Sequence, residues 1–343
     1  MLISSLKLRA LTSLLLMLLS LRGTEAFCAE NCPHVRLDDP GKSMEHVNPV
    51  KQRWQAICFA AGSAQMIDAF RFSHGDTNFD HQTSPLVLAV NQSQVSSKSV
   101  KPNEQWAARF MGWPADTLKN ALLYGSCDAF NQQAYDRWTT EFADVETLRS
   151  SLWINFSTRS QNYNPTAYAA QLCRALHRFS PIEAIASAKK ILGKSVEQLD
   201  FYKSELLTRL KEVIDLDCAE ATIPIAPKYS VQDEIVSINN SAAATENIRK
   251  GLVGEKAQPV GVTYCTSFIR ENQPCRPMQD TTHFSLIMGM ELRGGKCMFL
   301  IRDSQDDSEQ HSSFARDKEG QLWIPAQELI GNTQRLTWLE DNK

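Results

Sequence analysis

The sequence predicts an α+β fold in two lobes, with helices in about the first two thirds of the chain and antiparallel strands in the rest. Before about residue 220, apolar and small residues recur at helical intervals. After Pro224, short apolar runs bounded by turn residues replace that pattern. Helices followed by strands are typical of α+β folds, and the length of 343 residues fits two lobes.

The first 26 residues have the pattern of a secretory signal peptide. Lys7 and Arg9 precede an apolar run of 11 residues at Leu11–Leu21, and the small residues Thr24 and Ala26 follow at the expected cleavage site. The run is too short to span a bilayer core of about 30 Å as a helix. We therefore expect an exported protein, secreted or periplasmic, that has no membrane segment after cleavage.

The composition argues against several classes of protein. With 43% apolar and 22% charged residues the chain is neither disordered nor fibrous, and its net charge of −3 lacks the basic footprint of a nucleic-acid binder. There is no glycine-rich phosphate loop. Cys28 and Cys32 have a ligand-like spacing, but no second close pair follows them. We expect no metal and no organic cofactor.

The helical part begins after an irregular, proline-containing segment that ends near Gln52. Small and apolar residues then continue over three turns without proline, and two later segments carry a Ser-Pro start and a Tyr-Gly stop. A long helical stretch follows and is a candidate insertion. The predicted helices are Cys58–Phe70, a helix capped by Ser84 with Pro85 in its first turn, Asp116–Leu123, and those of the insertion 128–220.

The strand-rich part begins with one short helix, Thr245–Leu252. Arg293–Gly295 separates two apolar runs and predicts a hairpin turn. The predicted strands are Pro259–Cys265, His283–Glu291, Lys296–Arg302, Leu322–Ile324 and Leu336–Leu339. The expected organisation is a signal peptide at 1–26, an N-terminal segment and helical lobe at 27–127, the insertion at 128–220 and a β lobe at 221–343.

All nine cysteines follow the signal peptide, so we expect most of them to form disulfides in an oxidising compartment. An odd number leaves at least one thiol over. The pairing of the others stays open, although Cys265 with Cys275, across a ten-residue loop, is the simplest pair.

Cys58 is the candidate nucleophile because it stands at the predicted N-terminus of a helix, where the helix dipole stabilises a thiolate. Gln52 lies six residues earlier, so its side-chain amide can come back beside Cys58 and donate a hydrogen bond to an oxyanion. His283 opens an apolar strand and is the candidate base. Asp303 ends the strand across the tight turn, where it can orient the imidazole. Taken one by one, these residues also fit a packed helix start, a strand-end histidine and an acidic turn.

Together these motifs resemble those of the papain-like cysteine peptidases. QRWQAICFAAGSAQMID (Gln52–Asp68) is similar to the segment around the family's nucleophile, and HFSLIMGM, starting at His283, to its histidine motif. RDSQ (Arg302–Gln305) is similar to its Asn-Ser-Trp motif. NIRKGLVGEKAQPVGVTY (Asn247–Tyr264) and TSPLVLAV (Thr83–Val90) extend the resemblance, which covers about residues 45–127 and 222–340.

The resemblance implies a helical lobe and an antiparallel β-barrel-like lobe with the active-site cleft between them. Cys58 would attack a peptide bond and form a thioester, His283 would act as base and then acid, and Asp303 would hold His283. Gln52 and the Cys58 backbone N–H would form the oxyanion hole. The implied partner is a peptide or protein substrate, with an inhibitor or partner protein at the insertion as a further candidate.

The chain departs from the family pattern at several positions. Asp303 replaces an asparagine, Gln305 a tryptophan, Phe59 a tryptophan, and Ala56-Ile57 a Gly-Ser pair. The sequence between Ala26 and Cys58 leaves no room for an inhibitory pro-segment. Two alternatives therefore stay open: a non-catalytic protein that binds peptides or a partner, and a cell-wall amidase or acyltransferase that uses the same triad.

Overall fold

The computed structural model describes the chain in several stretches. These are residues 32–50, 57–92 except 86 and 90, 112–127, 222–223, 229–275 except 238 and 272, 282–304, 314, 316–317 and 321–342. The predicted signal peptide 1–26, the predicted insertion 128–220 and Gln52 lie outside the described residues. The chain divides into two compact units, the first with residues up to 51, 65–79 and 226–343, and the second with the described residues within 52–64 and 80–225.

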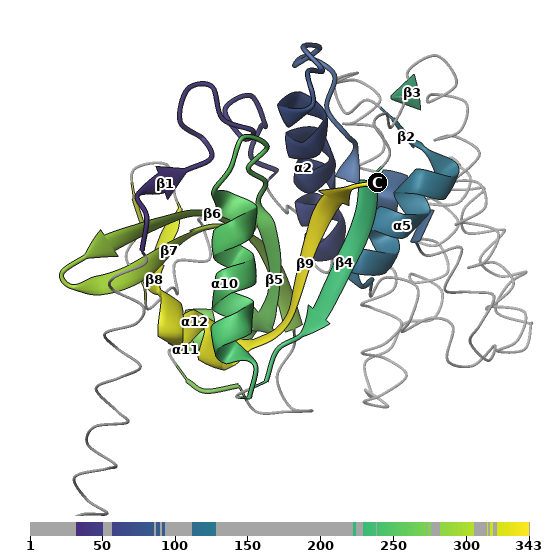
Figure 1. The fold of residues 1–343 in the computed structure, drawn as a ribbon. Coiled ribbons are helices and arrows are strands. Elements are labelled where there is room, and N and C mark those ends of the chain that lie inside the picture. The colour runs from purple at the N-terminus through teal and green to yellow at the C-terminus, as the bar shows by residue number, and fades with distance from the viewer. Residues whose placement is uncertain are drawn as a thin grey trace, which may run out of the picture. The chain divides into compact units, whose positions relative to one another are not determined.

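A seven-stranded antiparallel sheet forms the centre of the first unit (Figure 1). The strand order is β4-β9-β5-β6-β7-β8, and β1 pairs with β6. The long strand β6 pairs with β5 through its first half and with β1 through its second. The strands are β1 (Val35–Arg36), β4 (Tyr229–Ile235), β5 (Val260–Cys265), β6 (Thr282–Arg293), β7 (Lys296–Arg302), β8 (Leu322–Pro325) and β9 (Thr333–Asp341).

The hairpin between β6 and β7 has the turn that the sequence predicts. Arg293 pairs with Lys296, so the loop is two residues long. Its residues Gly294 and Gly295 have φ angles of 56° and 77°, which glycine adopts without a steric penalty. The turn sets the register from Arg293–Lys296 to Gly289–Leu300, and an irregularity between Ile287 and Gly289 shifts it by one residue for the pairs Ile287–Ile301 and Leu286–Arg302.

Three helices belong to the same unit: α10 (Ser241–Leu252), α11 (Thr266–Glu271) and α12 (Ala326–Asn332). Helix α10 buries Ala244, Ile248 and Leu252, which are four residues apart and so share one face. This face packs against β5 and β6, with α12 beside α10 (Figure 1). With these helices and the antiparallel sheet, the prediction of an α+β fold is confirmed.

The second unit contains α5 (Pro114–Tyr124), with β2 (Ser126–Cys127) paired to β3 (Thr222–Ile223). Gly125 follows α5 with a φ of 75°, as its Tyr-Gly stop predicts. The helix that begins at Pro85 also starts as predicted, because the Ser84 hydroxyl accepts a hydrogen bond from the Val87 backbone N–H at 3.5 Å.

Helix α2 (Cys58–Ser73) has residues in both units, with Cys58–Ala64 in the second and Gln65–Ser73 in the first. Most of its side chains are buried, including the charged Asp68 and Arg71. These two pair at 3.0 Å, and Arg71 also pairs with Asp76 at 2.6 Å. A helix buried on all sides belongs to the interior of a protein, so its charged residues need such partners.

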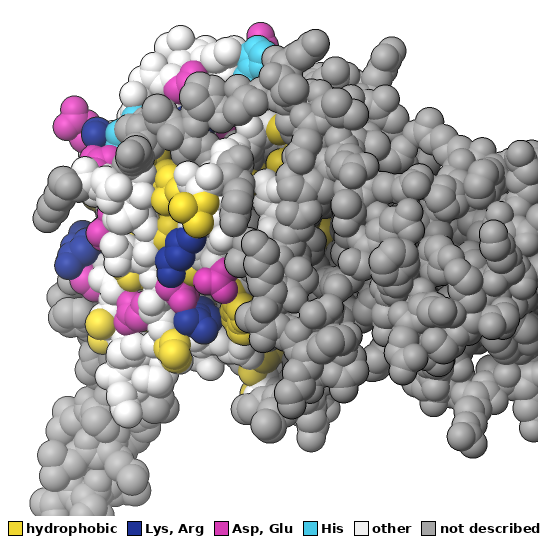
Figure 2. Space-filling model, turned by 90° about the vertical axis from the view of Figure 1, so that its right-hand side faces the viewer, with side chains coloured by type: hydrophobic (Ala, Val, Ile, Leu, Met, Phe, Trp, Pro, Cys, Tyr) yellow, Lys and Arg dark blue, Asp and Glu magenta, His cyan; other side chains and the backbone are white. Residues whose placement is uncertain are grey.

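The described surface mixes charges of both signs. On the face drawn in Figure 2, Lys and Arg side chains lie next to Asp and Glu side chains. Surface ion pairs of this kind include Arg335 with Asp233, and Lys256 with Asp341 at 3.0 Å. This arrangement fits the nearly balanced composition. Within the described residues, every helix is too short or too polar to cross a membrane.

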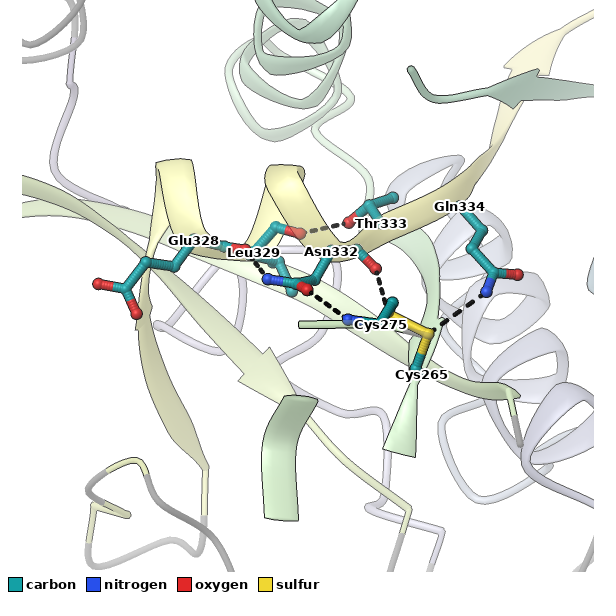
Figure 3. Close-up of a disulfide and its surroundings, with 7 residues drawn as sticks. All are labelled: Cys265, Cys275, Glu328, Leu329, Asn332, Thr333 and Gln334. Atoms are coloured by element: carbon teal, nitrogen blue, oxygen red, sulfur yellow. Dashed lines mark hydrogen bonds between the residues drawn. A yellow bond between two sulfur atoms is a disulfide. The ribbon is translucent and has the colours of Figure 1, made fainter. Parts of the chain in front are cut away.

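Two disulfides tie the first unit. Cys32 is bonded to Cys297 of β7, and Cys265 of β5 is bonded to Cys275, the pair that the sequence suggests. Figure 3 shows the second bond beside the end of α12, where the Asn332 side chain accepts a hydrogen bond from the Cys275 backbone N–H at 3.1 Å. This contact anchors the loop after β5 to the junction of α12 and β9.

The segment before Cys58, which the sequence indicates to be irregular, contributes to the sheet. Val35 and Arg36 form β1 and pair with Met290 and Gly289 of β6. Cys32, just before β1, is covalently held to β7. A strand of two residues is too short to show an alternating pattern, so its pairing partner decides its structure. Residues 32–50 therefore belong with the β-rich unit.

Gly289, the one glycine of β6, is expected to tolerate a side chain poorly, because the neighbouring strands approach it closely. A Cβ atom there would lie 2.8 Å from the Val35 carbonyl oxygen and 3.1 Å from the Leu300 Cβ. Gly289→Ala should therefore lower the free energy of unfolding by about 1–3 kcal/mol, measured by urea denaturation. Gly331→Ala in α12 is the matched control, because nothing lies within 4 Å of its Cβ position. Equal stability of both variants would contradict the close approach of β1.

Candidate active site

The register of the β6–β7 hairpin places three polar side chains on one face of the sheet. Leu286 pairs with Arg302, so Asp303, the next residue of the chain, comes opposite Ser285. His283 is two residues before Ser285 on β6 and shares its face, because side chains alternate along a strand. His283 is thus the diagonal neighbour of Asp303, within reach of a carboxylate.

His283 and Asp303 form a buried pair. The imidazole Nε2 lies 2.6 Å from Asp303 Oδ1, and the two side chains are 5% and 0% exposed. A carboxylate can only accept, so Nε2 carries the hydrogen of this bond. The contact fixes both the plane of the ring and its tautomer, and it directs Nδ1 away from the carboxylate. The neighbourhood that the strand order predicts is therefore present in the structure.

Two further hydroxyl groups reach this pair, and the sequence analysis did not single them out. Ser285 Oγ lies 3.2 Å from Asp303 Oδ1, and Tyr264 Oη lies 2.7 Å from Ser285 Oγ. Tyr264 is the β5 partner of His283, and its ring meets the imidazole edge to face at 5.6 Å. The period-two alternation from His283 would have identified Ser285, but the role of Tyr264 depends on strand order.

Arg302 holds the chain where it leaves β7. Its Nη1 donates a hydrogen bond to the Val47 carbonyl at 2.8 Å, and the side chain is buried. Burial lowers the pKa of Arg302 to about 10, although the negative charge of Asp38 acts to raise it. The guanidinium is therefore charged at neutral pH. The residue next to Asp303 is thereby fixed to the segment that precedes α2 in the sequence.

Cys58 is the first residue of α2 and is half-buried. Among the described cysteines it is the one that forms no disulfide, since Cys127 is also disulfide-bonded. The Ile57 carbonyl accepts hydrogen bonds from the N–H groups of Ala60 and Ala61 at 3.0 and 2.9 Å, which sets the first turn. The thiol therefore lies at the positive end of a 16-residue helix, as predicted.

Phe59 is held by Gly112 of the second unit. A Cβ atom at Gly112 would lie 2.3 Å from the Phe59 ring, so only a glycine leaves room for it. The aromatic residue after Cys58 is thus a packing residue, 4% exposed, that holds the start of α2.

Gln52 lies outside the described residues, so its part in an oxyanion hole stays a prediction, as do the catalytic roles of Cys58, His283 and Asp303. Cys32 cannot serve as a zinc ligand together with Cys28 while it is bonded to Cys297. Across the part of the chain that the structure describes, no group of three or more His, Cys, Asp or Glu side chains is arranged to hold a metal ion.

Comparison with known proteins gives matches among solved structures. No protein-family model and no curated protein sequence matches the chain. Procathepsin B S9 from Trypanosoma congolense is similar over 91% of this chain and 78% of its own, at 9% identity and a TM-score of 0.45. Digestive procathepsin L2 proteinase from Tenebrio molitor larval midgut is similar over 90% and 68%, at 12% identity and a TM-score of 0.43.

A third similar structure is the bromelain protease from Ananas comosus in complex with the E64 inhibitor. It covers 90% of this chain and 100% of its own, at 10% identity and a TM-score of 0.43. Each of these TM-scores is below 0.5. The α+β fold is therefore assigned from the helices and the antiparallel sheet themselves. The three proteins are papain-like cysteine peptidases, the family that the motifs around Cys58 and His283 resemble.

Proposed function

We propose that the chain is an exported thiol hydrolase that cleaves peptide bonds with Cys58 as nucleophile and His283 as base. The observation that carries the proposal is the buried His283–Asp303 pair, with Nε2 and Oδ1 at 2.6 Å, in a protein whose Cys58 thiol begins a helix and forms no disulfide. A carboxylate-oriented imidazole and a thiol at a helix N-terminus are the two groups that thiol-based acyl transfer requires.

The proposed reaction has two halves. The Cys58 thiolate attacks the peptide carbonyl carbon, whose π electrons move to the oxygen, and the Cys58 N–H and Gln52 amide donate to that oxyanion. The imidazolium of His283 gives its proton to the leaving amine, and the C–N bond breaks to leave a thioester. His283 then takes a proton from water, the hydroxide adds to the thioester, and the acid leaves as the thiolate is restored.

Asp303 supports this cycle by electrostatics. The imidazole of His283 becomes positively charged when it takes the proton of the thiol, and the carboxylate beside Nε2 stabilises that charge. Asparagine at this position would orient the ring but carry no charge. The replacement of asparagine by Asp303 is therefore compatible with the proposed chemistry.

We also propose that the protein works outside the cytoplasm, secreted or in a periplasm. The N-terminal apolar run and the disulfides Cys32–Cys297 and Cys265–Cys275 support this location. The proposed partner is a peptide or protein substrate. An inhibitor or partner protein acting through the insertion 128–220 belongs to the same proposal.

Brief alkylation of the non-reduced full-length protein tests the proposed function. Limiting iodoacetamide is expected to label Cys58, located by peptide mass spectrometry, and peptide hydrolysis should fall in proportion to the labelled fraction. Hydrolysis that persists after Cys58 is fully labelled would refute the nucleophile. Labelling without any hydrolysis in the untreated protein would favour a non-catalytic binding protein, and transfer of the acyl group to an added amine would favour an acyltransferase.

A further inference from the structure

The geometry points to Tyr264 and Ser285 as positioning residues that hold the Asp303 carboxylate for His283. This inference rests on the proposed function and extends its machinery by two hydroxyl groups. Neither residue is suggested to touch the substrate. Their part is to keep one carboxylate oxygen aligned with Nε2 while the imidazole gains and loses a proton.

The direction of the hydrogen bonds follows from the chemistry of the groups. Asp303 Oδ1 is an acceptor, so Ser285 donates its hydroxyl hydrogen across the 3.2 Å contact. A serine has only one such hydrogen. Across the 2.7 Å contact with Ser285 Oγ, Tyr264 must therefore be the donor. The result is an ordered chain from Tyr264 through Ser285 to Asp303, whose Oδ1 also accepts from His283.

Burial makes this chain costly to break. Tyr264 is 0% and Ser285 1% exposed, and the Asp303 side chain is 0% exposed. Water cannot easily replace a lost hydroxyl in such a place, and a buried carboxylate that loses a donor is less well stabilised as an anion. Removing either hydroxyl should therefore leave Asp303 free to turn from its productive orientation.

The backbone around Tyr264 is fixed on three sides. Tyr264 pairs with His283 of β6 and with Thr333 of β9, and a register shift separates it from Thr263. The next residue, Cys265, is bonded to Cys275, which Asn332 holds in turn (Figure 3). A group held so rigidly is suited to positioning a catalytic side chain.

The test uses Tyr264→Phe and Ser285→Ala in the full-length protein. Each variant is expected to lower kcat about 10-fold and to leave KM unchanged, because the hydroxyls act on geometry and not on substrate binding. The double variant should be no slower than Ser285→Ala alone, since the Tyr264 hydroxyl reaches Asp303 through Ser285 and phenylalanine keeps the ring. If the two losses of kcat multiply in the double variant, the hydroxyls act independently, and the hydrogen-bond chain from Tyr264 to Asp303 is overturned.

Thr263→Val is the matched control. Its hydroxyl is also buried on β5, 4% exposed, but has no hydrogen-bond partner among the described residues. Removing it is expected to leave kcat and KM unchanged. A loss of kcat equal to that of Tyr264→Phe would show that any buried change in β5 has the same effect and would overturn the inference.

A measurement without turnover separates this inference from the proposed function. The Nε2 hydrogen of His283 should give a low-field proton resonance, assigned by its loss in His283→Ala. In Ser285→Ala and Tyr264→Phe it should exchange faster with solvent, and in Thr263→Val at the wild-type rate. If the His283 Nε2 hydrogen exchanges at the wild-type rate in Ser285→Ala and Tyr264→Phe, the hydrogen-bond chain is overturned even if the enzyme is active. If the wild type is inactive but shows these exchange effects, the hydrogen-bond chain from Tyr264 to Asp303 is supported and the proposed peptidase activity is refuted.

Discussion

Replacing Cys58 with alanine is expected to remove peptide hydrolysis, with a fall in kcat of at least about 10³-fold. The physical reason is that no thioester can form without the sulfur, and the other described cysteines are held in disulfides. Alanine also favours the first turn of a helix, so α2 should begin as before. Hydrolysis of a fluorogenic peptide library and the thermal midpoint of unfolding measure the two effects.

Cys58→Ser is the control that separates thiol chemistry from packing. Serine has nearly the same size and can occupy the half-buried position, but its hydroxyl does not ionise near neutral pH. Both variants should therefore be inactive and retain wild-type stability. Normal hydrolysis in either variant would exclude Cys58 as the nucleophile and would favour another catalytic group or a contaminating peptidase.

Local patterns predicted the core of the β-rich unit well. The Gly-Gly turn after Arg293 predicted that two adjacent strands pair, which brings the start of β6, with His283, near the end of β7, before Asp303. The Ser-Pro start at Ser84 and the small-residue helix after Cys58 are equally local signals, and both are present in the structure. Such features depend on residues close in sequence, which is why one sequence sufficed.

Features that depend on distant partners were not predicted. Strand β4 carries mostly polar residues and pairs with β9, so that Tyr229 meets Asp341 near the other end of the chain. The Cys32–Cys297 disulfide joins residues 265 positions apart, and connectivity is not encoded in spacing. The role of the Tyr264 hydroxyl belongs to this class, because its contact with Ser285 arises from the β5–β6 pairing.

His74 illustrates how tertiary packing overrides a local interpretation. The sequence around it is polar and gives no sign of a packed ring. In the structure the ring stacks on Phe70 at 4.0 Å, and its Nε2 pairs with Asp341. The side chain is only 7% exposed. Among the described residues His74 and Asp341 thus form a second histidine–aspartate pair, but its aspartate is 51% exposed, and only the pair of His283 agrees with the proposed chemistry.

Replacing His283 with alanine is expected to lower kcat/KM by roughly 10³-fold. Without the imidazole, the thiol loses its proton acceptor and the leaving amine loses its proton donor. Iodoacetamide labelling of Cys58 should then need a higher pH than in the wild type, because only the N-terminus of α2 still stabilises the thiolate. In the wild type, labelling should persist several pH units lower, because a thiolate beside an imidazolium reacts in mildly acidic solution.

His74→Ala is the matched control for this prediction, because it also removes a buried imidazole that is paired with an aspartate. It is expected to lower stability while the alkylation profile and kcat stay as in the wild type. Added imidazole should partly restore hydrolysis in His283→Ala but not alter His74→Ala, since a small base can replace a proton acceptor but is not needed where the ring only packs. If the two variants lose activity equally and imidazole rescues neither, His283 has a structural role, because a catalytic base and a packing residue differ in just these responses.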